Sequence, residues 1–152
     1  MNETTRIRVA ILDDNQGIIN GYGFRLDQAP DIEVVATTTF GETLEAILAR
    51  HHPDLLILDV FVPTSAKNPA YYPVLQAIPR WLQLYPHLSI LVITAYPLRT
   101  LITAAIRAGA SGVVLKDDQE TIGELAEIIR TVARGDRFFS KKIDQRLLQR
   151  MA

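Results

Sequence analysis

Short apolar runs of strand length alternate with helix-period segments along nearly the whole chain, and this alternation limits the fold more than any other sequence feature. Three of the runs are almost continuously apolar, which is typical of parallel strands covered by helices on both faces. Strict alternation of strands and helices predicts a doubly wound α/β domain, with a five-stranded parallel sheet flanked by helices. The predicted strands are Ile7–Leu12, Ile32–Ala36, Asp54–Asp59, Ser89–Thr94 and Gly112–Lys116.

The helical segments between these runs carry recognisable end signals. Thr39 and Glu42 have the spacing of a capping box, which predicts the start of the second helix there. Gly109 follows an apolar stripe and is expected to end that helix in a left-handed turn. A last long helix is expected to begin near Asp118 and to end before Gly135.

Composition narrows the class of protein. The chain has 152 residues, enough for one domain with a good-sized core. It contains no cysteine, which excludes disulfides, thiolate metal sites and cysteine nucleophiles. Its net charge of −1 gives no sign of the broad basic surface that nucleic-acid binding needs. No signal peptide is visible, and no apolar run approaches the roughly 18 residues of a membrane span. These features predict a cytoplasmic chain without a membrane partner.

Ionisable and hydroxyl residues stand where the predicted strands end. Asp13 and Asp14 follow the first strand, Asp59 ends the third, Thr94 the fourth and Lys116 the fifth. In a doubly wound sheet these ends meet at one functional edge. Three carboxylates would repel one another unless a cation lies among them, and Mg²⁺ prefers such oxygen ligands. Each residue alone is more often a turn or helix cap, but the set favours phosphoryl chemistry with Asp59 as the nucleophile.

The chain resembles the receiver domain of two-component response regulators, a flavodoxin-like fold, over roughly residues 6 to 140. The resemblance rests on a spaced set of motifs and not on any one of them. The matching stretches are Val9–Asn15, Pro53–Val60, Val62-Pro63, Ile93–Tyr96 and Ala108–Asp117.

The resemblance implies a role for each residue of the set. It makes Asp59 the residue that a sensor histidine kinase phosphorylates, and a regulatory acceptor rather than part of an enzyme. It implies that Thr94 and Lys116 contact the phosphoryl group. The implied Mg²⁺ ligands are Asp13, Asp14, Asp59 and the main-chain carbonyl of Phe61.

The stretch from Lys116 to Ser140 is most similar to the LuxR-type branch, whose members usually carry a C-terminal helix-turn-helix domain. We therefore expect a receiver domain over 1–140 and a C-terminal helix or linker over 141–152. DNA would be contacted only through a domain that this chain lacks, either because the chain is cut before it or because the protein is a single-domain regulator. A homodimer contact through the tail is left open.

Two departures from the family pattern leave an alternative open. Val113 stands where the family usually has an aromatic switch residue, and Val is too small for that role. The segment after Asp59 is long and rich in proline and aromatic residues, and Pro79 is expected to kink or break the third helix. Both departures favour a pseudo-receiver, a binding module that signals without phosphorylation. A hydrolase on the same scaffold is disfavoured, because no separate acid or base accompanies Asp59. The bulky Phe61 and Tyr96 are expected to exclude water from the acceptor.

Overall fold

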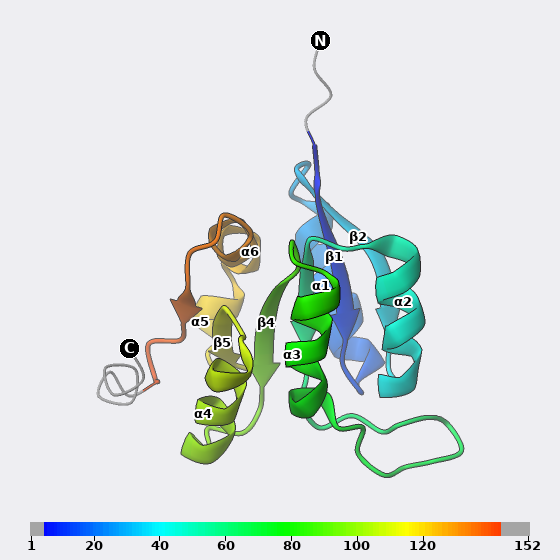
Figure 1. Cartoon of the computed structure of the whole chain (residues 1–152). Coiled ribbons are helices and arrows are strands. Elements are labelled where there is room, and N and C mark those ends of the chain that lie inside the picture. Colours follow the sequence, from blue (N-terminus) through cyan, green and yellow to red (C-terminus); the bar gives the residue numbers. More distant parts are fainter. Residues whose placement is uncertain (1–4, 144–152) are drawn as a thin grey trace.

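The computed structural model describes residues 5–143 and shows strands and helices in regular alternation (Figure 1). The elements are β1 (Ile7–Leu12), α1 (Gln16–Asp27), β2 (Ile32–Thr38), the 3-10 turn η1 (Gly41–Thr43), α2 (Leu44–His51), β3 (Leu55–Leu58), α3 (Val74–Leu84), β4 (Ser89–Thr94), α4 (Arg99–Ala108), β5 (Gly112–Leu115), α5 (Gln119–Ile122), α6 (Leu125–Ala133) and β6 (Phe138–Phe139).

All strands run parallel in one sheet of order β2-β1-β3-β4-β5-β6. The strand order reverses at β1, which has β2 on one side and β3 on the other, and such a switch point is where α/β sheets place their sites. Leu12 lies opposite Leu58, and Asp59 N–H donates to the Leu12 carbonyl at 2.9 Å. The residues that follow β1 and β3 therefore emerge side by side.

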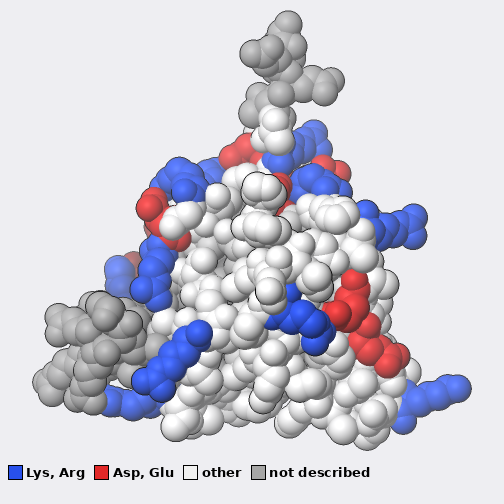
Figure 2. All heavy atoms as spheres, in the orientation of Figure 1, with Lys and Arg blue, Asp and Glu red and all other residues white. Residues whose placement is uncertain are grey.

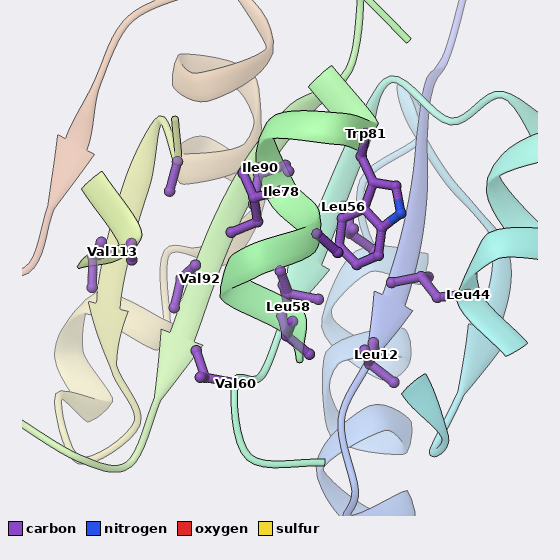
Figure 3. Close-up of a cluster of buried hydrophobic side chains, with 14 of the residues drawn as sticks. Leu12, Leu44, Leu56, Leu58, Val60, Ile78, Trp81, Ile90, Val92 and Val113 are labelled. Carbon is purple, nitrogen blue, oxygen red and sulfur yellow. The ribbon is translucent and has the colours of Figure 1, made fainter. Parts of the chain in front are cut away.

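Alternate side chains of the strands point to opposite faces of the sheet and pack into two separate cores, as a sheet covered on both faces requires. Ala10 and Leu12 belong to the core under α2, α3 and α4, where Trp81 and Ile78 are fully buried (Figure 3). Val9 and the other inward residues of the opposite face belong to the core under α1 and α6. The doubly wound α/β class predicted from the apolar runs is confirmed.

The sheet has a sixth strand that the sequence did not predict. Phe138 and Phe139 pair in parallel with Gly112 and Val113 of β5. Beyond this pair, Ser140 is buried, and its Oγ accepts the Leu115 N–H at 2.9 Å. The segment leaving α6 is thus bonded along β5. The predicted C-terminal helix or linker of 141–152 lies almost entirely outside the described residues.

The start of the second helix was predicted wrongly. Phe40 is the N-cap of η1 and Thr43 that of α2, so Thr39 and Glu42 do not form a capping box at a helix start. Strand β2 continues to Thr38, whose Oγ accepts the Phe40 N–H at 3.1 Å. The local hydrogen bond that a threonine offers is used for a turn before the helix.

The single long helix predicted last is in fact two helices, because the helix is interrupted at Gly123 and Glu124, between α5 and α6. Its predicted start is confirmed: Asp118 is the N-cap of α5 and accepts the Thr121 N–H. Gly109 ends α4 at φ 118°, as predicted.

Of the expected kink or break at Pro79, the break is wrong, because α3 continues through Pro79 from Val74 to Leu84. Pro79 is exposed, whereas Ile78 and Trp81 beside it are fully buried. Burial of that apolar face outweighs the hydrogen bond that a proline removes from the helix.

The surface over α3 and α4 is mostly uncharged on the side shown in Figure 2, and its Lys and Arg side chains lie mainly towards the edges. The broad basic face that DNA binding needs is therefore not found among the described residues on this side. Within residues 5–143, no helix is long and apolar enough to cross a membrane.

Candidate functional site

An acidic cluster lies at the carboxyl edge of the sheet. Asp13 and Asp14 follow β1 and Asp59 follows β3, so the paired registers of these strands bring the three side chains together. Each offers a carboxylate oxygen within 4.8 Å of the others. Asp13 and Asp59 are buried, whereas Asp14 is exposed.

Asp13 also prepares the start of α1. Its Oδ1 accepts the Asn15 N–H at 2.9 Å, and Asn15 in turn caps α1 by accepting the Ile18 N–H at 3.2 Å. This chain of hydrogen bonds fixes the orientation of the Asp13 carboxylate and leaves its other oxygen for the cluster.

Lys116 reaches into the cluster from the end of β5. Its Nζ lies 2.8 Å from Asp13 Oδ2 and 3.1 Å from Asp59 Oδ2. The backbone N–H of Lys116 donates to the Thr94 carbonyl at 2.8 Å, and this bond holds the Lys116 backbone beside β4. The ammonium group therefore bridges two carboxylates that come from different strands.

The charges of the site do not cancel. Three carboxylates surround one ammonium, so two negative charges remain when all are ionised. Burial, only partly offset by Lys116, raises the pKa of Asp59 to about 6. Burial also raises the pKa of Asp13, against the lowering effect of Lys116. The excess of two negative charges and the set of oxygen donors fit a hard divalent cation such as Mg²⁺.

Thr94 and Phe61 are held by the loops that follow their strands. Thr94 is fully buried at the end of β4, and its Oγ accepts the Tyr96 N–H at 3.2 Å. Phe61 N–H points to Asp59 Oδ1 at 3.4 Å, so the chain after β3 folds back towards the Asp59 carboxylate. The predicted residues thus share one edge, although Thr94 bonds to its own loop and not to the acidic cluster.

Two residues near the site were missed by sequence reasoning. Tyr22 of α1 is buried, and the pKa of its phenol is raised by burial and by the charges of Asp13 and Asp59. Tyr71 contacts Phe61 ring to ring at 5.3 Å between centroids. Tyr22 gave no signal beyond its place on a glycine-rich helix. Tyr71 was visible only as part of an aromatic-rich loop whose course the sequence does not determine.

The parallel α/β domain thus carries an acidic cluster and a lysine at the switch point of its sheet, where such folds place their sites. The sequence model of the response regulator receiver domain matches residues 9–130 of the chain. The chain therefore belongs to the response regulator receiver domain family, a family of regulatory rather than catalytic domains.

The relatives are longer regulators. The chain is 27% identical to the transcriptional regulatory protein DegU of Brevibacillus brevis over 152 residues, covering 98% of the chain and 61% of that protein. It is 28% identical to the oxygen regulatory protein NreC of Staphylococcus carnosus over 142 residues, covering 93% of the chain and 62% of that protein. The chain thus spans about three fifths of the length of these curated relatives.

Solved structures show the same fold. The isolated receiver domain of RcsB from Salmonella enterica serovar Typhimurium, with the phosphomimetic BeF3−, aligns with a TM-score of 0.77 at 23% identity, covering 94% of this chain and 99% of that one. A LuxR-family two-component response regulator from Aurantimonas sp. SI85-9A1 aligns with a TM-score of 0.79 at 23% identity, covering 97% and 99%.

Proposed function

We propose that this domain accepts a phosphoryl group on Asp59 and passes the change on as a switch of its surface. The observation that carries the proposal is the bridge of Lys116 between Asp13 and Asp59, with Asp14 in the same cluster. A phosphoryl group on Asp59 Oδ would meet a fixed positive charge on one side and cation ligands on the other.

The Asp59 carboxylate is suited to act as a nucleophile. With a pKa of about 6 it is mostly ionised at neutral pH, yet more basic than an ordinary aspartate. One of its oxygens attacks phosphorus, and the bond between phosphorus and the leaving atom of the donor breaks, with the electron pair going to that atom. The leaving atom is an imidazole nitrogen for a histidine kinase and a carboxylate oxygen for acetyl phosphate. Lys116 Nζ stabilises the transferring oxygens. Protonation of this carboxylate removes the nucleophile, so phosphorylation is expected to slow in acid.

The carboxylates that would hold Mg²⁺ are those of Asp13, Asp14 and Asp59. The family resemblance adds the main-chain carbonyl of Phe61 as a further ligand. When bound, the ion would neutralise charge on the phosphoryl oxygens during transfer.

The proposed output follows from the charge that phosphorylation adds. The group brings roughly −1.5 to −2 charges and three acceptor oxygens. Lys116 and the Thr94 hydroxyl are drawn towards it, and the loops leading into α4 and α5 shift with them. Val113 is fully buried in the core, so a swinging side chain at that position is not part of the proposed route.

The names of the relatives support a wider proposal. We infer a cytoplasmic regulator of the LuxR-type branch, phosphorylated by a sensor histidine kinase and controlling transcription through a helix-turn-helix domain beyond this chain. Structures of RcsB dimers bound to DNA support a homodimer as a further partner.

The test is modification of the purified chain by acetyl phosphate with and without Mg²⁺, followed by intact mass. We expect a gain of one phosphoryl group that requires Mg²⁺ and is lost in Asp59→Asn. Asp117→Asn, an exposed aspartate beside Lys116, serves as the matched control and should be modified like the wild type. Wild-type protein that gains no mass would overturn the proposal and favour a binding module that signals without phosphate.

A further inference from the structure

The long loop between β3 and α3 is a small hairpin. Pro63 pairs with Tyr71 as an antiparallel bridge, and the Thr64 N–H donates to the Ala70 carbonyl at 2.8 Å. At the tip, Ser65 and Asn68 exchange backbone hydrogen bonds of 3.1 and 3.2 Å. The loop therefore has a defined course that returns the chain to the edge of the site.

The base of this hairpin is fixed to η1. Gly41 N–H donates to the Pro63 carbonyl at 2.9 Å, and Glu42 N–H donates to the Thr64 carbonyl at 3.1 Å. A Cβ on Gly41 would lie 2.2 Å from the Tyr72 Cβ, so only glycine allows this approach. The position of the neighbouring Tyr71 is therefore set by backbone bonds on both sides of the hairpin.

Tyr71 completes a row of three aromatic rings. Its ring centroid lies 5.3 Å from that of Phe61, and Phe61 lies 4.8 Å from Tyr96 at an interplanar angle of 81°. The outer rings are 65% (Tyr71) and 48% (Tyr96) exposed, whereas the middle ring is half-buried. Tyr71 and Tyr96 thus hold Phe61 between them, in the edge-on and tilted geometries that aromatic pairs prefer.

Two members of the row are tied to the proposed phosphoryl site through their backbones. Phe61 N–H points to Asp59 Oδ1, and Tyr96 N–H donates to Thr94 Oγ. The Phe61 backbone therefore lies directly beside the Asp59 carboxylate, and its ring starts from that position. Among its described contacts, Tyr71 makes no hydrogen bond to Asp59 or Thr94. Any effect of Tyr71 on the site therefore acts through its ring contact with Phe61.

We propose that Tyr71 is a positioning residue: it holds Phe61 in place beside Asp59 and thereby slows hydrolysis of the phosphoaspartate. This rests on the proposed phosphorylation of Asp59. In that hydrolysis a water oxygen attacks phosphorus, and the bond between phosphorus and Asp59 Oδ breaks. The electron pair stays on the carboxylate, and the inorganic phosphate leaves with the oxygen and both hydrogens of the water, as H2PO4⁻. A mobile Phe61 ring leaves the approach to phosphorus more open to water.

The test compares phosphoryl lifetimes. Protein phosphorylated by acetyl phosphate and Mg²⁺ is freed of donor by gel filtration, and loss of the phosphoryl mass is followed with time. We expect Tyr71→Ala to lose the group roughly two- to tenfold faster, the range that one aromatic pair supports. Tyr71→Phe keeps the ring and should restore the wild-type rate.

Phe24→Ala removes an equally exposed aromatic ring on α1 and should hydrolyse like the wild type. Unchanged urea midpoints for all variants show that the effect is not one of folding, and Tyr71→Leu provides a second variant if Tyr71→Ala unfolds. A wild-type lifetime in both Tyr71→Ala and Tyr71→Leu overturns the inference. Wild-type protein that never gains the phosphoryl group overturns it together with the proposed function.

Discussion

At the scale of single residues, the Asp59 carboxylate is held where its charge is unfavourable. Asp59 is buried beside Asp13, and Lys116 offsets only part of the cost of that burial. The folded protein therefore keeps the proton of Asp59 up to about pH 6, whereas an unfolded chain releases it at the ordinary aspartate pKa of 3.8. In the absence of a bound cation, a site of this kind is expected to reduce the stability of the fold.

Asp59→Asn should therefore stabilise the cation-free protein at pH 7. The pKa of Asp59 rises from 3.8 to about 6, and each unit corresponds to about 1.4 kcal/mol, so the gain is at most about 3 kcal/mol. Below about pH 4 the carboxyl is protonated in both states, so the two proteins should be equally stable there. The difference should develop between about pH 4 and pH 6.

Urea unfolding in a chelator, at a series of pH values, measures this difference. Asp54→Asn is the control and should not be stabilised. The Asp54 carboxylate lies outside the cluster and accepts the backbone N–H of Arg8 at 2.8 Å. If Asp59→Asn proves less stable than the wild type at pH 7, the ion pair with Lys116 outweighs the burial of Asp59.

The set of residues in the cluster could be predicted, but its internal contacts could not. Asp13, Asp59 and Lys116 each follow directly after a strand, and parallel strands end at one edge whatever the details of packing. That Lys116 Nζ would lie between Asp13 and Asp59 depends on side-chain directions and burial, which strand order does not determine. Tyr71 could not be placed because its position depends on the hairpin and on Gly41.

At the scale of elements, glycines end two helices by different means. Gly109 has φ 118°, and a Cβ there would lie 2.5 Å from Leu82 Cδ1 of α3. Gly135, after α6, has φ 96°, and a Cβ there would meet nothing within 4 Å. One glycine thus serves backbone conformation and helix packing together, while the other serves conformation alone.

Gly135→Ala should lower the free energy of unfolding by about 1 kcal/mol, the cost of the left-handed region for a residue with a Cβ. Gly109→Ala should cost that amount and roughly 1–2 kcal/mol more, because Leu82 must move. Urea unfolding of the pair measures both. Equal losses would show that Leu82 adjusts without cost.

The bond from Leu115 N–H to Ser140 Oγ continues the pairing of β5 beyond the two residues of β6. Ser140→Ala leaves that buried N–H without its acceptor and should lower the free energy of unfolding by about 1–3 kcal/mol. Ser89→Ala removes a longer, half-buried bond of 3.4 Å to the Val132 carbonyl and should cost less. Chemical denaturation compares them, and equal effects would argue against a special role for Ser140.

The elements differed in how far the sequence could predict them. Strands β1, β3, β4 and β5 are apolar runs whose burial on both faces leaves a clear pattern, and the edge strand β2 is half-buried but still β-branched and apolar. Strand β6 is too short to show a period, and its pairing depends on the path of the chain after Gly135. The apolar stripe that continues from Ile122 to Leu125 hides the break between α5 and α6, because both helices bury their apolar faces against the same core.

At the scale of the whole molecule, one ion pair joins parts that lie 99 residues apart. Arg130 of α6 meets Asp31, before β2, through two hydrogen bonds of 2.8 and 2.9 Å. Their side chains are 33% and 36% exposed, and Arg130 lowers the pKa of Asp31. This paired contact links the first and last thirds of the fold on the α1 and α6 side of the sheet.

Asp31→Asn should lower the thermal midpoint slightly in low salt, and the difference should vanish near 1 M NaCl, where screening is strong. Asp136→Asn removes the more exposed pair with Arg134, which spans 3.7 Å, and should show no difference at either salt concentration. Thermal unfolding followed by circular dichroism measures both variants. A loss for Asp31→Asn that persists in high salt would mean that hydrogen-bond geometry, and not charge, supports the contact.

The hairpin between β3 and α3 has an anchored base and an exposed tip, and the tip should tolerate changes of length better than the base. Its base is joined to η1 and to itself through Pro63, Thr64 and Tyr71, whereas residues 66–70 at the tip are exposed. Insertions and deletions at the tip are expected to leave the anchored base in register. The length of the loop could then change without moving the chain next to Asp59. The same property makes the bond between Lys67 and Asn68 a suitable place to insert an epitope tag or a fluorescent label.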